Sequence, residues 1–462
     1  MTNNNTNNNT NNNTNNNTNN NTKKKTYTIV VKLGSSSIVD EKTKEPRIAN
    51  MSLLVETLVK LRRQGHRIVL VSSGAIAVGL KRVGIDKKPK KLSRVQALAA
   101  IGQGKLITLW DNMFRHLDQT TAQILLTRND IIDFAQFRNA ENTLEELLNM
   151  NVIPIVNEND TLSIQEIKFG DNDTLSAITA GMVNADYLFL LTDVDCLYTD
   201  NPRTNPDAKA VVIVKDMNSL DVDTSSTGSS VGTGGMATKL IAADLATNAG
   251  VTTVICNSTK PTTMLEIVNY SHQVDTELRN SIDDTTLHET SEEFELTNKL
   301  ELENLKKYNV PLHTRFIGQP RNSVKNKEFW LLHGLKPSGS LIIDLGCFKA
   351  ITQRKRAGLL AVGVIATEGH FNQLECVEIK LGFRDELNGG LDSSKGLYTI
   401  GRGRCNYSSS EIEKIKGHQS DEIANIIEYS DSEYVVHRQN LAFPLHQESS
   451  LSELLEKLNF KY

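Results

Sequence analysis

The chain has 462 residues, of which 39% are hydrophobic and 23% charged, and its formal net charge is -4 at pH 7. Its length predicts two domains with sizeable apolar cores, and its balanced charge argues against the polycationic surface of a general nucleic-acid binder. The five cysteines are scattered without the close pairs of structural zinc sites, and no apolar run is long enough for a transmembrane helix. We therefore expect a cytoplasmic protein with reduced thiols and no membrane partner.

Residues 1–22 are almost entirely Asn and Thr. This tract has no apolar face, and nothing in it offsets the entropy lost on ordering, so it predicts a disordered tail. Assembly through the Asn-rich tract is the alternative interpretation.

Residues 23–270 alternate short apolar runs with windows of helical spacing, which predicts an α/β domain with a mainly parallel sheet. The expected strands are Tyr27–Val31, Arg67–Val71, Val152–Val156, Tyr187–Leu191 and Val251–Ile255. The expected helices are Ser52–Gln64, Ser93–Arg115, Asn139–Asn149, Thr174–Val183 and Met236–Ala249. Ligands of such sheets bind at the carboxyl ends of the strands, and the polar and Gly-bearing segments lie at these ends.

Residues 271–337 are acidic and polar, most strongly from Asp275 to Glu303. This composition predicts a solvated linker or insertion with one short helix near Ser291 to Tyr308. An acidic docking segment is the alternative.

Residues 338–442 contain short strand-like runs separated by Gly and polar residues, which predicts a small β-barrel domain. The expected strands are Ser340–Asp344, Leu359–Ala366, Val377–Lys380, Leu397–Gly401 and Tyr434–His437. Helices are expected at Ser408–Gly417 and Ser420–Glu428, and residues 443–462 form a C-terminal tail.

The first candidate phosphate site follows the first predicted strand, where Lys32 precedes Gly34 and three serines. Backbone N-H groups near Gly34 would cradle phosphate oxygens, and the lysine would supply a point charge. A plain turn is the alternative. The segment matches neither the Walker pattern nor Gly-x-Gly-x-x-Gly, which argues against P-loop and dinucleotide-binding proteins.

Two further polar segments suit a small zwitterionic ligand. Ser72 to Ala75 expose backbone N-H groups at a predicted helix start, which binds anions, although a simple helix cap is the alternative. Asn157 to Asp160 and Gly170 to Asp173 carry both donors and acceptors, as an amino acid requires. A plain turn or a calcium loop is the alternative for these two, but the Asp spacing and terminal Glu of a calcium loop are absent.

Nucleotide binding is best indicated by Thr192 and Asp193, which follow a predicted strand, and by the segment Thr233 to Lys239. Consecutive glycines before a helix with Thr and Lys in its first turns are typical of a nucleotide phosphate site.

These segments together resemble the glutamate 5-kinases of the amino acid kinase family, and the C-terminal region resembles a PUA domain. The matching segments are VVKLGSSS at Val30–Ser37, SSGAIAVG at Ser72–Gly79, PIVNEND at Pro154–Asp160, FGDNDTLSA at Phe169–Ala177, LLTDVDCLYTDNPR at Leu190–Arg203 and GTGGMATK at Gly232–Lys239. The PUA resemblance rests on SGSLIID, GLLAVGV and YSSSEIEKIKGHQSDEI. Together, the two resemblances imply a three-layer αβα sandwich with a mainly parallel central sheet, followed by a PUA-like β-barrel.

The resemblance implies transfer of the ATP γ-phosphoryl group to the side-chain carboxylate of L-glutamate, the first step of proline synthesis. By motif match, Lys32 and Lys239 contact the phosphates, and Asp173 holds the lysines. Glutamate would be bound by Ser73, Asp160 and Asn172. ATP would be bound by Lys32, Thr192, Asp193, Thr233, Gly234, Gly235, Met236, Ala237, Thr238 and Lys239. Mg²⁺ would bridge the phosphates, and no protein ligand of the metal is assigned.

The resemblance also implies a homo-oligomer, feedback inhibition by proline and a separate glutamyl phosphate reductase as partner. The sequence departs from the family at Cys196, where Gly is usual, at Ala361, where Pro is common, and in the length of the acidic stretch. Two alternatives stay open: another amino acid kinase, acting on aspartate or acetylglutamate, or an RNA-binding protein that acts through the PUA-like domain. Acidic residues at least as frequent as basic ones between Ser338 and Asn440 argue against RNA.

Overall fold

The computed structural model describes residues 26–40, 42–162, 172–202, 204–215, 217, 220, 235–271, 291–318, 326–353, 357–385, 389–429 and 432–443. The tail predicted for residues 1–22 lies outside these ranges, as does all but the first residue of the tail predicted for 443–462. Within the described ranges, no helix combines the length and the apolar character that crossing a membrane would require.

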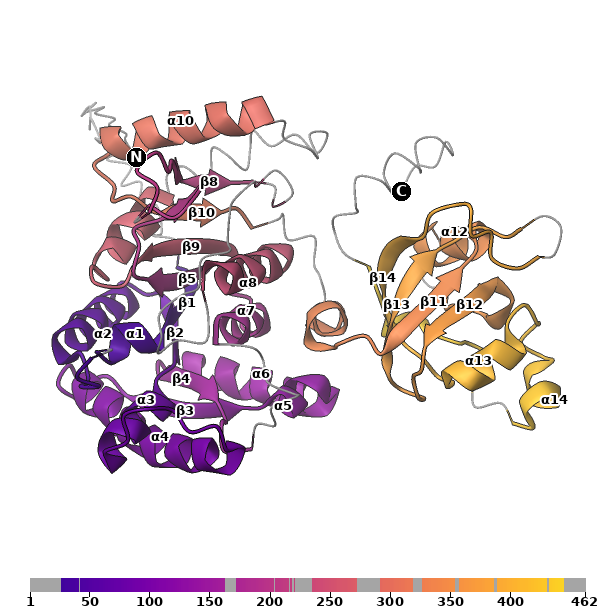
Figure 1. Cartoon of the computed structure of the whole chain (residues 1–462), viewed down its shortest axis with the longest axis horizontal. Helices are drawn as coiled ribbons and strands as arrows, with labels where there is room; N and C mark the ends of the chain where they lie inside the picture. The colour runs from indigo at the N-terminus through magenta and orange to yellow at the C-terminus, as the bar shows by residue number, and fades with distance from the viewer. Residues whose placement is uncertain are drawn as a thin grey trace, which may run out of the picture.

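An eight-stranded sheet forms the centre of the N-terminal domain, in the order β3-β4-β2-β1-β5-β9-β10-β8 (Figure 1). Its strands are β1 (Thr28–Leu33), β2 (Arg67–Ser72), β3 (Thr121–Leu126), β4 (Ile153–Glu158), β5 (Tyr187–Thr192), β8 (Ile213–Val214), β9 (Thr252–Asn257) and β10 (Thr314–Phe316). Neighbouring strands from β3 to β9 are parallel, whereas β10 runs antiparallel to β9. The five predicted strands are therefore confirmed, each within two residues of its expected bounds.

Helices cover both faces of this sheet, so the domain is a three-layer αβα sandwich as predicted. One face packs against α2 (Ile48–Arg63), α3 (Ala75–Val83) and α4 (Leu92–Arg115), and the other against α6 (Phe134–Asn149), α7 (Asn172–Met182) and α8 (Met236–Asn248). Successive strand residues alternate between the two cores: Val30 packs in one, and Ile29 and Val31 in the other. Burial on both faces explains why the strands read as continuous apolar runs.

The region predicted as an acidic linker differs from that expectation, because part of it belongs to the sheet domain. Helix α10 (Ser291–Lys307) lies within one residue of the expected bounds, but β10, which was not predicted, follows it. The guanidinium of Arg315 on β10 is fully buried and pairs with Glu301 of α10, which also accepts a hydrogen bond of 2.9 Å from the Tyr270 hydroxyl. This buried pair joins α10 to the sheet.

The C-terminal domain has its own core around a five-stranded sheet in the order β12-β11-β13-β14-β15. Its strands are β11 (Gly339–Ile343), β12 (Val364–Gly369), β13 (Cys376–Leu381), β14 (Tyr398–Arg404) and β15 (Leu441–Ala442), and its helices are α12 (Leu345–Gln353), α13 (Ser409–Ile415) and α14 (Ile423–Ile427). Two strand predictions were wrong in part: β12 begins only at Val364, after a 3-10 turn, and Tyr434–His437 makes a single bridge, from Val436 to Leu359.

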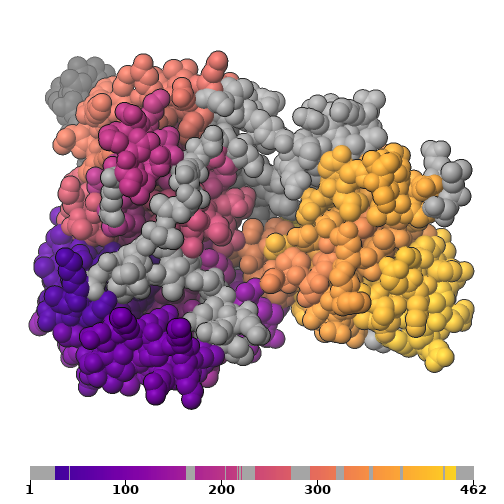
Figure 2. All heavy atoms as spheres, in the orientation of Figure 1, coloured from indigo at the N-terminus to yellow at the C-terminus, as the bar shows by residue number. Residues whose placement is uncertain are grey.

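A short helical joint lies between the two domains, which form separate lobes in the space-filling view (Figures 1 and 2). It consists of α11 (Asn326–Phe329) and the π-helical turn η3 (Trp330–Gly334). The buried Trp330 indole donates a hydrogen bond of 2.6 Å to the carbonyl of Ile131 in the N-terminal domain. On the other side, Lys327 Nζ donates to Asn440 Oδ1 over 3.0 Å. The joint is therefore packed into both domains.

Gly181 provides a test of this packing, because a Cβ at this position of α7 would overlap the buried ring of Phe329. We expect Gly181→Ala to lower the free energy of unfolding by about 1–3 kcal/mol, the usual effect of overpacking. The matched control is Gly104→Ala in α4, where a Cβ would meet open space; it should raise stability by up to about 1 kcal/mol. Urea unfolding measures both, and equal effects of the two variants would contradict the proposed close contact.

Candidate active site

A buried carboxylate lies between two buried lysines at the carboxyl end of the sheet. Lys32 is on β1, Asp173 is in the first turn of α7, and Lys239 is in the first turns of α8. Their exposed fractions are 5%, 0% and 7%. Lys32 Nζ pairs with Asp173 Oδ1, and Lys239 Nζ lies 3.4 Å from Asp173 Oδ2. The three residues that the sequence analysis assigned to catalysis are thus in direct contact.

The environment of Asp173 keeps its carboxyl ionised. Burial alone would raise its pKa, but the charges of Lys32 and Lys239, with hydrogen bonds from Lys32 and Thr238, outweigh burial and hold the pKa below the usual 3.8. Thr238 Oγ1 donates to Asp173 Oδ2 over 2.9 Å. Two cations around one anion leave an excess positive charge among buried side chains, which suits the binding of a phosphoryl group.

The predicted anion-binding segments around Gly34 and Gly74 lie at the same edge of the sheet. Gly34 follows β1, and a Cβ added to it would lie 3.7 Å from Lys32 Nζ. Gly74 caps the N-terminus of α3 with a φ of 107°, in the left-handed region that favours glycine. The N-terminus of α3 therefore lies directly after β2, whereas residues 159–171 separate α7 from β4 and residues 215–235 separate α8 from β8.

Two of the three residues assigned to glutamate, Ser73 and Asn172, are hydrogen-bonded to each other beside Asp173. Asn172, adjacent to Asp173, donates from Nδ2 to Ser73 Oγ over 2.7 Å and to Asn157 Oδ1 over 2.9 Å. Asn172 Oδ1 is buried and has no hydrogen-bond partner among the described residues. Asp160 lies in the turn after β4 and is half-buried. Gly170 and Asp171 lie outside the described residues.

The predicted nucleotide segments are described in part. Thr192 ends β5 and is buried, and its hydroxyl donates to Asp193 Oδ1 over 3.3 Å. Gly235 caps α8, and its carbonyl accepts a hydrogen bond of 2.9 Å from Thr238 Oγ1. Met236 is half-buried and Ala237 exposed at the start of α8. Thr233 and Gly234 lie outside the described residues.

Two hydrogen bonds around the site were missed by sequence reasoning. Asn157, only 2% exposed, links Asn172 to Gln103 of α4, because its Nδ2 donates to Gln103 Oε1 over 2.9 Å. Ser37 Oγ donates over 2.8 Å to Ser258 Oγ, which joins the segments after β1 and β9. The polar run Asn157 to Asp160 was the only sequence signal for the hydrogen bond of Asn157. Nothing in the sequence pointed to Gln103.

Cys196, the departure noted after β5, is fully buried in the described structure. Burial is the largest cause that raises the pKa of its thiol, to about 12. Cys196 is therefore a neutral, small apolar side chain that packs in place of the usual glycine, and it supplies no thiolate to the site.

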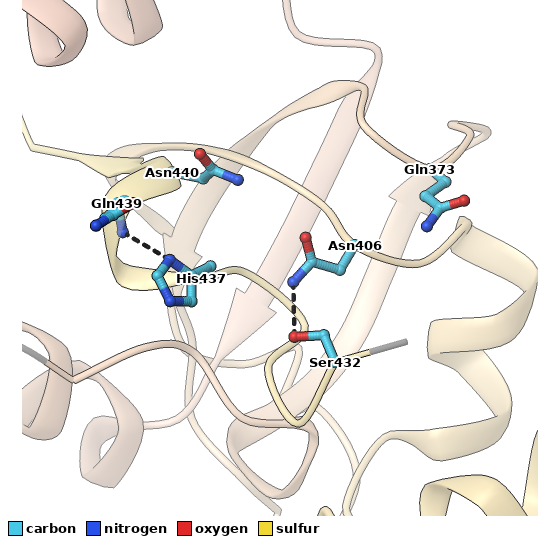
Figure 3. A pocket seen from close by; sticks show the side chains of 6 residues that line it. All are labelled: Gln373, Asn406, Ser432, His437, Gln439 and Asn440. Atoms are coloured by element: carbon cyan, nitrogen blue, oxygen red, sulfur yellow. Dashed lines mark hydrogen bonds between the residues drawn. The ribbon is translucent and has the colours of Figure 1, made fainter. Parts of the chain in front are cut away.

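A separate polar pocket of about 370 Å³ lies in the C-terminal domain (Figure 3). It is lined by Gln373, Asn406, Ser432, His437, Gln439 and Asn440. The lining consists of amide, hydroxyl and imidazole side chains, and none of it is Lys or Arg. This pocket shares no residue with the lysine cluster, and its lining does not resemble a phosphate-binding surface.

Comparisons with known proteins agree with the fold. The sequence profile of the amino acid kinase family matches residues 27–257, and that of the PUA domain matches residues 339–427. The chain belongs to the amino acid kinase family, with a C-terminal PUA domain.

Within that family, the chain is similar to proteins named glutamate 5-kinase. A probable glutamate 5-kinase of Schizosaccharomyces pombe is 54% identical over 417 residues, which cover 90% of this chain and 93% of that protein. An uncharacterized protein of Saccharomyces cerevisiae is 53% identical over 424 residues, which cover 91% and 99%. The glutamate 5-kinase of Rippkaea orientalis is 43% identical over 417 residues, which cover 90% and 98%. The resemblance drawn from the sequence motifs is thereby confirmed.

Proposed function

We propose that this chain transfers the γ-phosphoryl group of ATP to the side-chain carboxylate of L-glutamate, giving L-glutamyl 5-phosphate and ADP. The single observation that carries this proposal is the position of the Asn172–Ser73 pair beside the Lys32–Asp173–Lys239 cluster, since Asn172 directly precedes Asp173 in the chain. This arrangement supports a cationic site for the phosphoryl group next to an amide site for an amino acid. Relatives named glutamate 5-kinase, similar over nine-tenths of the chain, support the same substrate.

The chemistry requires positioning and positive charge rather than proton transfer. The glutamate side chain, with an ordinary pKa of about 4.3, is already a carboxylate at neutral pH, so no base is needed. One of its oxygens forms a bond to the γ-phosphorus, the bond from that phosphorus to the β,γ-bridging oxygen breaks, and ADP leaves with the electron pair. Lys32 and Lys239 would stabilise the charge on the transferring group and reduce the repulsion between the two anions.

Asp173 is proposed to act on the lysines rather than on the substrate. Its two oxygens are engaged by Lys32, Lys239 and Thr238. These contacts hold both ammonium groups in one place before the substrates bind, which avoids the cost of ordering two long side chains during the reaction. The low pKa of Asp173 also excludes it as a proton donor at neutral pH.

Mg²⁺ fits the site as an ion carried by the nucleotide. Among the described residues, no group of three or more His, Cys, Asp or Glu side chains is placed to hold a metal. Since the lysines occupy Asp173, phosphate oxygens would be the main ligands, as is usual for Mg²⁺ in kinases. When bound, Mg²⁺ would neutralise phosphate charge. ATP would be held by Thr192, Asp193 and the segment Thr233 to Lys239.

The proposed product determines what must act next. An acyl phosphate is a reactive mixed anhydride, so we propose that a separate reductase consumes it on the way to proline. Family membership also suggests a homo-oligomer that is inhibited by proline at or near the glutamate site. Co-purification, light scattering and proline titration test these three proposals separately.

A substrate panel tests the choice of amino acid. We expect kcat/KM for L-glutamate to exceed that for L-aspartate and N-acetyl-L-glutamate by about 100-fold or more. The aspartate carboxylate is one methylene shorter, and misplacement by about 1 Å costs on the order of 100-fold; acetylation removes the ammonium that an amide oxygen would bind. ADP release measures all three under identical conditions. Faster turnover of either competitor would refute glutamate as the substrate.

A further inference from the structure

One face of α4 contacts the ends of two strands that lead to the polar cluster of Ser73, Asn157 and Asn172. This cluster is called the glutamate cluster below. Gln103 and Trp110 are seven residues apart, which places them two turns apart on the same side of the helix. Trp110 Nε1 donates to Ser72 Oγ over 2.9 Å at the end of β2. Gln103 Oε1 accepts from Asn157 Nδ2 over 2.9 Å at the end of β4. A Cβ at Gly102 would overlap the backbone of α3, so close helix packing determines where this face lies.

A backbone group determines which way the amides of this cluster point. Asn157 Oδ1 accepts a hydrogen bond of 2.9 Å from the backbone N-H of Glu158. A backbone N-H can only donate, so the atom that faces it must be the amide oxygen. Asn157 Nδ2 must therefore point to the opposite side, where Gln103 presents its carbonyl oxygen. Without Gln103, a buried amide N-H of Asn157 would lack its acceptor, and rotation of the side chain would become favourable.

Asn157 in turn determines the orientation of the Asn172 side-chain amide. The remaining acceptor capacity of Asn157 Oδ1 takes a hydrogen bond from Asn172 Nδ2, which also donates to Ser73 Oγ. Since both hydrogen bonds use the Nδ2 atom, Asn172 Oδ1 is left as a buried acceptor with no partner among the described residues. An unpaired buried acceptor in the proposed glutamate site needs a donor from the ligand, and the ammonium is the charged donor of glutamate.

We propose that Gln103 is a positioning residue for glutamate: through Asn157, it holds the Asn172 amide with Oδ1 directed at the substrate ammonium. This inference rests on the proposed function, because it assumes glutamate as the ligand. Gln103 lies outside the lysine cluster, so it acts on glutamate binding and not on phosphoryl transfer.

Replacing Gln103 with Met tests the proposal, because Met has a similar length and offers no comparable acceptor. We expect the KM for glutamate to rise about tenfold, the effect of about one buried hydrogen bond, while kcat and the KM for ATP change less than about twofold. Lys105→Met, on the exposed face of the same helix, is the matched control and should leave all three constants unchanged. Thermal unfolding of both variants shows whether the fold is retained.

Inhibition by glutarate, which lacks the ammonium, separates positioning from general loss of binding. The ratio of the glutarate inhibition constant to the glutamate KM should fall about tenfold in Gln103→Met relative to the native chain. Unchanged constants, an unchanged ratio, or equal losses in kcat and both KM values with a lower unfolding temperature would overturn the proposal. A native chain that does not turn over glutamate would overturn the proposed function itself, and the inference with it. A native chain that is active but insensitive to Gln103→Met would overturn the inference alone.

Discussion

Lys239→Ala is expected to lower kcat by about 100-fold or more at saturating ATP and glutamate, because it removes one of the two cations around the transferring phosphoryl group. Lys239 is 7% exposed, so water cannot easily replace the lost charge. Asp173 would keep Lys32 and Thr238 as partners, and the fold should survive. Steady-state ADP release measures the effect.

Lys299→Ala is the matched control for this substitution, since it removes an exposed lysine from α10. It should leave kcat unchanged. A Lys239→Ala enzyme with kcat within about threefold of the native value would show that this lysine does not stabilise the transferring group.

Asp173→Asn is expected to have the second large effect, on both activity and stability. Two buried ammonium groups would lose the anion that they share, and removing one partner of a buried ion pair typically costs about 3–5 kcal/mol. With the lysines no longer held in place, kcat should fall about 100-fold or more. Urea unfolding and ADP release at neutral pH measure the two effects.

The pH dependence of stability provides the control for Asp173. Its pKa is lower in the folded protein than the usual 3.8. The ionised carboxylate therefore contributes stability that is fully present above the unfolded-state pKa and is lost as pH falls through the folded-state pKa. The difference in unfolding free energy between the native chain and Asp173→Asn should be largest at neutral pH and shrink in acid. A difference that is constant with pH would contradict the proposed ion pairs.

The central strands could be predicted from the sequence because they are buried on both faces. β1 and β5 contain the apolar runs Ile29–Val31 and Tyr187–Leu191, and a buried strand follows from such runs. β3 was missed because it lies at the edge of the sheet and only one of its six residues is buried. β10 was missed because it has three residues with a charged one, Arg315, at its centre. Its burial depends on the distant Glu301, which no local pattern reveals.

The candidate site shows the same division between local and distant information. Lys32, Asp173 and Lys239 each stand in a recognisable segment, so the sequence could nominate them separately. Their contact depends on the parallel order of β1, β5 and β9, which only the structure shows. Gln103 had no signal at all, since a half-buried Gln within an amphipathic helix is an ordinary residue there. Only its hydrogen bond to Asn157 distinguishes it.

The strand predicted at Tyr434–His437 shows where composition misleads. Tyr, Val and Val favour strands, but in the described structure only Val436 forms a bridge, and His437 instead starts the turn that leads to β15. Strand formation depends on a neighbouring edge as well as on propensity. In this domain β14 is already paired on both sides, with β13 and β15.

Trapping of the product tests the central claim most directly. The native chain with ATP, Mg²⁺ and L-glutamate should release ADP only when glutamate is present. In the presence of hydroxylamine, which converts acyl phosphates to hydroxamates, it should form one glutamyl hydroxamate per ADP. Both products should be lost together in Lys239→Ala. ADP release without glutamate dependence, or glutamate-dependent ADP release without hydroxamate, would contradict transfer to the side-chain carboxylate.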